Sequence, residues 1–181
     1  MRAGWLQFTL LIGWGLAGLA VVHAGLDARI WWALGGGIVL LMLADAWALH
    51  QQPTPEVQRE LPEALPLGIE RDVVLQLQSS ARQRVDVFDH APGAWPMQGL
   101  PAKLHLRAGT QTRFQYRLRP VVRGDARFDA VQLRLHSPLR LWWQSRQAGQ
   151  AQTVRVYPNF APLTRFALFS AEQASRLVGA H

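Results

Sequence analysis

The chain has 181 residues, a formal net charge of +7 and no cysteine. This length allows one ordinary domain and a membrane anchor, but not two large soluble domains. The lack of cysteine excludes a disulfide framework, a thiolate nucleophile, a cysteine zinc site and an iron–sulfur cluster. The positive charge, in which Lys103 is the only lysine, suits anionic lipid headgroups or an acidic protein partner.

Two apolar runs open the sequence. Ala3 to Val22 contains no charged residue, and Ile30 to Leu49 contains only Asp45. Each run is long enough for an α-helix to cross a hydrocarbon core of about 30 Å. The connector between them is short enough to force the two helices into an antiparallel hairpin. We therefore predict a transmembrane hairpin over residues 1–50.

Tryptophans near the ends of these runs support two spans, because indole rings prefer the headgroup level. The expected membrane anchors are Trp5, Trp31, Trp32 and Trp47.

Small residues four apart indicate where the two helices approach each other. These pairs are Gly13 with Ala17 and Ala33 with Gly37. Asp45 lies about one turn from the end of its helix, where we expect a partly hydrated carboxylate. A proton relay is the alternative, but it would require further ionisable side chains within the membrane.

A cleaved secretory signal is an alternative to the first span. Arg2 precedes the apolar stretch, and Val22 with Ala24 forms a small-residue pattern. The stretch is longer than the roughly 7–15 apolar residues of a signal, and a second span comes directly after it, which favours the hairpin. The Lys/Arg bias, with Arg2 and Arg59 on one side, slightly favours both termini in the cytoplasm.

The segment 51–68 is rich in proline, glutamine and glutamate. Pro53, Pro55, Pro62 and Pro66 interrupt it, and proline blocks regular hydrogen bonding. We expect a partly extended linker here.

Alternation of apolar and polar residues dominates the segment 69–160. It indicates short strands with one wet face, separated by turns rich in glycine and proline. We predict a mainly β fold, an antiparallel immunoglobulin-like β-sandwich. Within 161–181, Ser170 to Val178 is typical of a short helix with Ser170 as N-cap. The alternating segments centre on Val73–Leu77, Val85–Val87, Leu104–Leu106, Phe114–Leu118, Val131–Leu135, Leu139–Trp143 and Val154–Tyr157.

Residues with catalytic potential do not form a recognisable motif. His105 and His136 fall on exposed strand faces, where solvated side chains are expected. Asp86 and Asp89 should point to opposite faces of their strand. There is no Gly-rich phosphate loop after a strand and no Gly-x-Ser-x-Gly elbow. The sequence predicts a protein that is not an enzyme and has no cofactor and no metal site.

Three arginines share one face of a predicted strand: Arg113, Arg117 and Arg119. This candidate contact face could bind lipid phosphates or an acidic partner, and a merely solvated polar face is the alternative. Phe114 and Tyr116 point toward the core, which argues against nucleic-acid binding, where aromatics accompany exposed arginines. The adhesion-like tripeptide starting at Arg123 is interpreted as an ordinary turn.

Several motifs recur in the order known from one bacterial family. They are Val85-Asp86-Val87-Phe88-Asp89 with Pro92, then Tyr116-x-Leu118-x-Pro120, Arg123-Gly124, Ser137-Pro138-Leu139 with Leu141-Trp142, and Val156-Tyr157-Pro158-Asn159. With two N-terminal spans, this arrangement resembles the N-terminal region of the domain-of-unknown-function family fifty-eight. The family is usually encoded beside MoxR-type AAA+ ATPases.

The resemblance has two departures. The family has glycine after its Ser-Pro-Leu element, where this chain has Arg140. Its most recognisable stretch, with a domain resembling a von Willebrand A fold, would come after His181. The resemblance therefore implies a fragment, a split gene or a short variant, and functions of that domain do not transfer.

These observations lead to an expected function. We expect a non-enzymatic accessory or adaptor protein in the cell inner membrane, with two spans and a cytoplasmic sandwich that makes protein contacts. The resemblance implies a MoxR-type ATPase as partner, beside membrane lipids and without nucleic acid. An extracytoplasmic envelope-binding module is the alternative.

Overall fold

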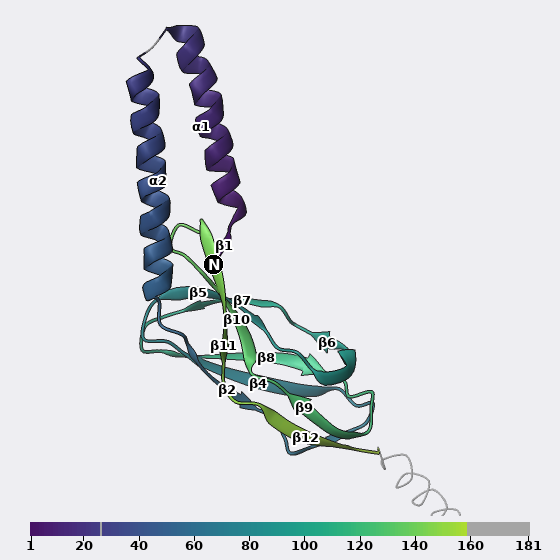
Figure 1. Cartoon of the computed structure of the whole chain (residues 1–181). Coiled ribbons are helices and arrows are strands. Elements are labelled where there is room, and N and C mark those ends of the chain that lie inside the picture. The colour runs from purple at the N-terminus through teal and green to yellow at the C-terminus, as the bar shows by residue number, and fades with distance from the viewer. Residues whose placement is uncertain (26, 159–181) are drawn as a thin grey trace, which may run out of the picture.

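The computed structural model describes residues 1–25 and 27–158. The helix expected at Ser170–Val178 lies outside these residues. A hairpin of two helices, α1 (Trp5–Ala24) and α2 (Ala28–Gln51), stands on a β-sandwich (Figure 1). Both helices are long and apolar enough to cross a membrane. α1 buries no residue, and a helix that is apolar on all sides suits lipid rather than water.

A pair of tryptophans clasps the two helices together. The rings of Trp14 and Trp31 stack with centroids 4.4 Å apart. The indole N–H of Trp14 donates to the carbonyl of Trp31 at 3.2 Å, and that of Trp31 donates to the carbonyl of Trp14 at 3.1 Å. These bonds satisfy both indole donors inside an apolar interface. Trp31 therefore ties the helices together, and its predicted place at the headgroup level stays a prediction.

The close approach of the helices depends on other small residues than expected. A Cβ atom added to Gly18 would lie 2.8 Å from the Trp31 ring, and one added to Gly35 would lie 2.8 Å from the Trp14 ring. Gly13 and Gly37 have nothing within 4 Å of such an atom. The four-residue spacing is a poor guide because the bulky indoles, not the small pairs, set the contact. Trp5, Trp32 and Trp47 are 73%, 64% and 67% exposed on the hairpin, as headgroup anchors would be.

Two main sheets form the sandwich. One has the order β1-β11-β10-β5-β7 and the other β2-β4-β8-β6, while a small third sheet has the order β3-β12-β9. All pairings are antiparallel except that between β3 and β12. The strands are β1 (Arg2–Ala3), β2 (Glu56–Glu60), β3 (Ala64–Pro66), β4 (Arg71–Gln78), β5 (Gln83–Phe88), β6 (Met97–Gln98), β7 (Ala102–Leu106), β8 (Gln111–Leu118), β9 (Gly124–Phe128), β10 (Val131–His136), β11 (Trp142–Ala148) and β12 (Gln152–Tyr157).

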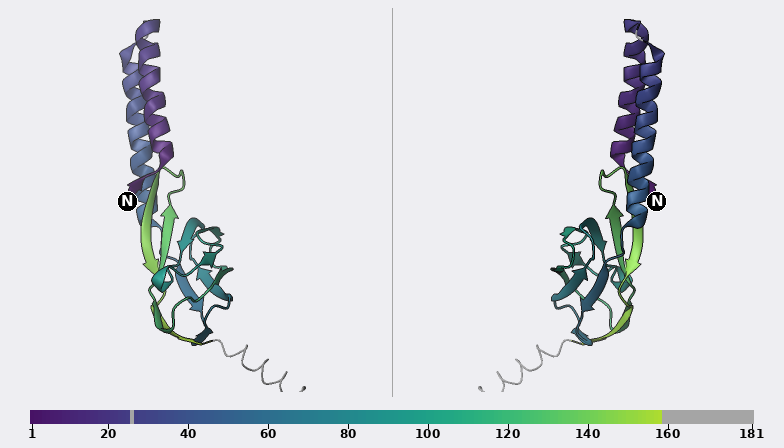
Figure 2. Two further views of the ribbon diagram at one scale, coloured as in Figure 1. Left: turned by 90° about the vertical axis from the view of Figure 1, so that its right-hand side faces the viewer. Right: turned by 90° about the vertical axis from the view of Figure 1, so that its left-hand side faces the viewer.

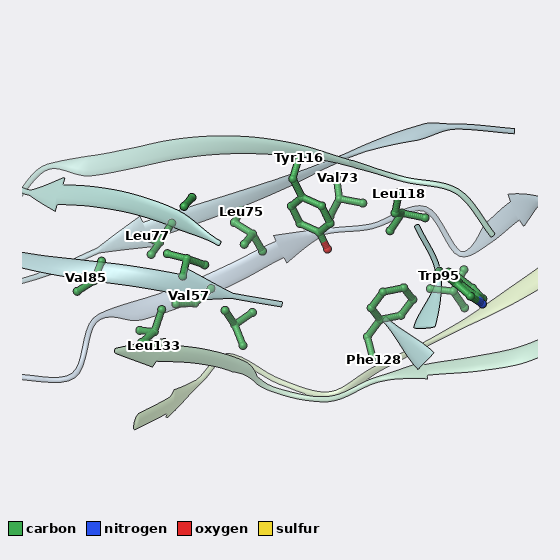
Figure 3. Packing of buried hydrophobic residues seen from close by; sticks show 14 of the residues in the cluster. Val57, Val73, Leu75, Leu77, Val85, Trp95, Tyr116, Leu118, Phe128 and Leu133 are labelled. Carbon is green, nitrogen blue, oxygen red and sulfur yellow. The ribbon is translucent and has the colours of Figure 1, made fainter. Parts of the chain in front are cut away.

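The core lies between the two main sheets, as Figure 3 shows. Alternate residues of β4, β5 and β10 point inward, which confirms the predicted immunoglobulin-like sandwich. Val73, Leu75 and Leu77 of β4 and Leu133 and Leu135 of β10 are 0% exposed. An added edge strand, β1, pairs Arg2 and Ala3 with the start of β11.

The predicted linker is wrong from Glu56 onward, because β2 and β3 lie within it. Val57 and Leu65 are buried in the core. Both strands are at sheet edges, where proline is tolerated because one side of the strand makes no ladder bonds. The prolines therefore bracket β2 and end β3 without preventing either strand. The sandwich begins at Glu56 and not at residue 69.

Filling Gly35 should disrupt the tryptophan clasp. Gly35→Val puts side-chain atoms into the Trp14 ring, which its stacking on Trp31 holds in place. We expect the hairpin to lose about 1–3 kcal/mol of stability and the stacked indoles to lose their near-ultraviolet circular dichroism in detergent. Gly13→Val is the matched control, since nothing lies within 4 Å of its Cβ. Equal spectra for the two variants would contradict the clasp.

Candidate functional site

The helices and the sandwich meet at the segment 137–142 between β10 and β11, which we call the junction turn. The Arg140 amide donates to the Ser137 carbonyl at 3.0 Å, and the Trp142 amide donates to Ser137 Oγ at 3.0 Å. Pro138 occupies the second position of this turn, where its fixed φ is favourable. The sequence predicts a strand from Leu139, but β11 starts only at Trp142 because the residues before it close the turn.

A buried carboxylate holds the junction turn against α2. Asp45 is 3% exposed and accepts the amide of Leu139 at 2.9 Å and that of Leu141 at 3.3 Å. The two oxygens of the Asp45 side chain thus each accept one backbone amide of the turn. The carbonyl of Leu141 accepts the amide of Gly4 at 2.7 Å, just before α1. The turn is therefore fixed between the ends of both helices.

Side chains of β11 complete the attachment of α2. Trp142 Nε1 donates to the Met42 carbonyl at 2.9 Å. Arg146 Nη1 donates to the Gln52 carbonyl at 2.6 Å, and its Nη2 donates to the Leu49 carbonyl at 3.3 Å. The last carbonyls of a helix lack partners within the helix, and a cation there also complements the helix dipole. Arg146 thus caps α2 from the sandwich, and Figure 2 shows the helix hairpin standing on the strands at this junction.

The predicted environment of Asp45 is wrong. A partly hydrated carboxylate at the interface is expected from the sequence, whereas the junction turn covers this one from water. The partners of Asp45 lie 94 and 96 residues further along the chain, so no local pattern points to them. An isolated charge in an otherwise apolar run is the one available hint, because such charges are retained only where something pairs with them.

Arg140 adopts a backbone conformation that favours glycine. Its φ is +61°, which is in the left-handed region where a Cβ atom costs about 1–2 kcal/mol. Glycine adopts this conformation without a Cβ penalty, so glycine would be the residue expected at this point of the turn. Gly4 is constrained for a different reason, since an added Cβ would lie 2.5 Å from the Arg140 carbonyl oxygen.

A second group of family-like elements lies at the end of the sandwich away from the helices, where β12 ends (Figure 1). The Tyr157 carbonyl accepts the Leu67 amide at 2.8 Å, and the Pro120 carbonyl accepts the Gly68 amide at 2.8 Å. Exposed apolar side chains gather at this end and form what we call the distal patch: Val121, Val122 and Tyr157, at 48%, 57% and 47% exposure. Arg123, Gly124 and Pro158 adjoin them, all exposed.

The Arg123-Gly124-Asp125 tripeptide is not a free loop tip. Gly124, with φ +109°, begins β9. Asp125 pairs with Arg155 of β12 at 2.7 Å, and this bond lowers the pKa of the Asp125 carboxyl. The aspartate is therefore part of the sheet surface.

The predicted arginine face is exposed on β8, but its members have partners. Arg113 pairs with Glu60 at 3.0 Å and Arg117 with Asp72 at 3.4 Å. Arg119 donates to the Gly68 carbonyl at 2.9 Å. Cross-strand carboxylates thus compensate most of this row. Exposed pairs of this kind contribute little to stability.

A buried charged cluster joins the two main sheets. Arg59 of β2 bonds both carboxylate oxygens of Asp89, at 2.9 and 2.7 Å, and the Tyr116 hydroxyl donates to Asp89 at 2.7 Å. Burial, and then the neighbouring carboxylate, raises the pKa of the Tyr116 phenol far above its usual range. All three groups are buried. Two of them belong to the family-like motifs, while Arg59 falls within the predicted linker.

Asp86 points to the opposite face from Asp89, as predicted, and meets His136 at 2.9 Å. The expectation that His136 is simply solvated is therefore wrong. In the strand register His136 lies opposite Arg84, and Asp86, two residues further along β5, is its diagonal neighbour. His105 is exposed. Within residues 1–25 and 27–158, no three His, Asp or Glu side chains are placed to hold a metal ion.

Removing the Asp45 carboxylate should loosen the junction turn. Asp45→Ala leaves the Leu139 and Leu141 amides without acceptors, at a cost of about 1–3 kcal/mol. We expect these two amides to exchange hydrogen faster in detergent, while the amide of Leu133 in the core keeps its protection. Asp45→Asn, which keeps one acceptor oxygen, should lie between. Unchanged exchange in Asp45→Ala would refute this account of the junction.

Arg140→Gly should stabilise the protein. Glycine relieves the left-handed strain, and the gain exceeds the entropy that glycine adds to the unfolded chain, leaving about 0.5–1 kcal/mol. Thermal unfolding in detergent measures it. Arg140→Ala is the control, because it removes the same side chain but retains the strain. If both variants melt alike, backbone strain at this position has no role.

No family model matches this chain, and no curated protein does either. Solved structures share the fold at low identity. The C-terminal part of alpha-2-macroglobulin from Escherichia coli gives a TM-score of 0.49 at 15% identity, covering 60% of this chain and 17% of that chain. A CARDB domain from Pyrococcus furiosus gives a TM-score of 0.38 at 10% identity, and the match covers 59% of this chain and 90% of that chain. The PKD domain of an M14-like peptidase from a Thermoplasmatales archaeon gives a TM-score of 0.37 at 11% identity, and the match covers 60% of this chain and 99% of that chain. The chain thus spans 17% of the macroglobulin chain that it matches, and the likeness concerns the sandwich fold alone.

Proposed function

We propose that this chain is a non-enzymatic, membrane-anchored adaptor of the bacterial inner membrane, whose sandwich holds a protein-contact surface in a fixed place beside the bilayer. The distal patch is that surface. Its partner is a MoxR-type AAA+ ATPase or a protein on which such an ATPase acts. The observation on which the proposal rests is the pairing of a rigid membrane junction at one end of the sandwich with exposed apolar residues at the other.

The junction supports this function because it fixes the sandwich to the hairpin. A flexible tether would use a polar or proline-rich linker. Here Asp45, Trp142 and Arg146 bind the end of α2 directly, and β1 adds a second attachment next to α1. A partner that docks at the distal patch therefore has a defined position relative to the membrane.

The distal patch supports a protein partner. Within the described part of the chain, the large apolar residues exposed outside the hairpin are Val121, Val122, Leu139 and Tyr157, with Met1 at the terminus. Three of them gather at the distal end. Clustered exposed apolar residues with polar neighbours are typical of protein contact sites, and Tyr is enriched at such sites.

The proposed partner follows from the resemblance to the family that is encoded beside MoxR-type ATPases, and several of the resembling motifs have a place in the fold. Ser137 and Pro138 build the junction turn, and Arg140 has the conformation that favours the family's glycine. Asp89 and Tyr116 form the buried cluster. These motif residues therefore have structural roles in this fold.

Retention of the first helix and a cytoplasmic sandwich are part of this proposal. Cleavage after Ala24 would remove β1 and the Gly4–Leu141 bond, so the fold favours an uncleaved hairpin. The sandwich then lies on the same side as Arg2, the side that the Lys/Arg bias slightly assigns to the cytoplasm.

Topology and proximity test this proposal together. Reporter fusions after His181, one active only in the cytoplasm and one only outside, should report the cytoplasm. A photo-crosslinking residue at Val122 should then form an adduct with the ATPase or its client in nucleotide-bound cells. The same residue at Gln115, exposed on β8, is the control and should give no such adduct.

An external reporter signal would end the ATPase proposal, since the two proteins could not meet. It would favour the alternative, an extracytoplasmic envelope-binding module. A cytoplasmic signal with equal crosslinking at Val122 and Gln115 would remove the distal patch as the contact site.

A further inference from the structure

We propose that a basic pocket at the membrane-facing end of the sandwich binds the phosphate headgroup of an anionic lipid. The pocket has a volume of about 360 Å³ and lies between the chain entering α1 and the outer face of β10, β5 and β7. This site is separate from the distal patch and does not depend on the ATPase proposal. It requires only that the hairpin spans a bilayer.

The pocket is strongly cationic. Asp86 is the only carboxylate among the residues that line it within the described chain, and it already pairs with His136 at 2.9 Å. The basic side chains that line the pocket come from three adjacent strands and the junction turn, and they are Arg84, Lys103, His105, Arg134, His136 and Arg140.

Strand register places these groups directly beside one another. Arg84 lies opposite His105 on β7 and opposite His136 on β10. Asp86 lies opposite Lys103 and Arg134. Arg84, Lys103 and Arg134 thus surround Asp86, whose single carboxylate already bonds His136 and cannot compensate three cations. A bound anion would offset this excess of positive charge, as the cross-strand carboxylates do for the arginines of β8.

One cation is held rigidly in place. The guanidinium of Arg134 lies 4.4 Å from the centre of the Trp143 ring and 4.8 Å from that of Phe88. Stacking of this kind restricts the side chain while leaving its N–H groups available. A guanidinium fixed before binding suits a phosphate, which accepts two parallel hydrogen bonds from it.

The position of the pocket selects a lipid over a free anion. Gly4 and Trp5 form part of its wall, and Trp5, 73% exposed, begins the first membrane helix. An indole at the start of a span lies at headgroup level, so the pocket opens where lipid phosphates are concentrated. The headgroup could enter the pocket while its acyl chains stay beside α1.

Native mass spectrometry of the whole chain tests this inference. The protein is released from nanodiscs that contain phosphatidylglycerol and phosphatidylcholine in equal amounts. We expect one phosphatidylglycerol to remain bound in preference to phosphatidylcholine. The double variant Arg84→Gln, Lys103→Gln should retain it at least tenfold less, because each cation removed weakens the attraction to an anionic lipid about fivefold. Arg127→Gln, which removes an exposed charge on β9, should retain it like the wild type.

Two further readouts make the result decisive. The double variant should unfold at the same temperature as the wild type or higher when lipid is absent, because it loses a repulsion and no ion pair. Equal retention of both lipids, or equal loss in Arg127→Gln, would overturn the proposal. So would displacement of the retained lipid by millimolar inorganic phosphate, which would assign the pocket to a free anion.

Discussion

The buried carboxylate of Asp45 is the interaction on which this architecture depends. A charge near the end of a membrane span is costly unless it is paired or hydrogen-bonded. Here two backbone amides of the junction turn donate hydrogen bonds to it. The side chain of α2 thus satisfies amides that have no acceptor within the sandwich. The Arg146 cap works in the opposite direction, supplying donors from β11 to the last carbonyls of the helix. Together they turn an anchor and a domain into one rigid unit.

Short-range periodicity made much of the fold predictable from the sequence. Alternation in β4, β5, β8 and β10 identifies the buried faces correctly, because one side of each strand packs in the core and the other is wet. Length and apolarity locate both helices. The strand β2 cannot be predicted in this way, because its flanking prolines resemble those of an irregular linker although edge strands tolerate them.

Long-range pairing explains the other errors. Nothing local to Asp45 distinguishes a hydrated carboxylate from one covered by a distant turn. Arg59 and Asp89 are 30 residues apart, and Trp14 and Trp31 meet only because the hairpin closes. The basic pocket escapes sequence reasoning for the same reason, since its cations resemble the ordinary solvent-exposed faces of three separate strands until the strand register brings them together. The arginine row on β8 is conspicuous in one strand, but neighbouring strands neutralise it.

The pairing of β1 with β11 has a consequence for how the protein is made. Arg2 and Ala3 are synthesised about 140 residues before their strand partners Trp142 and Trp143. Domains generally form from the N-terminus onward during synthesis, so here the hairpin would enter the bilayer while its edge strand and the Asp45 carboxylate still lack partners. The order of assembly is then set by the chain itself: insertion first, closure of the sandwich last. The pairing of β1 with β11 can therefore form only after both helices have reached their final positions.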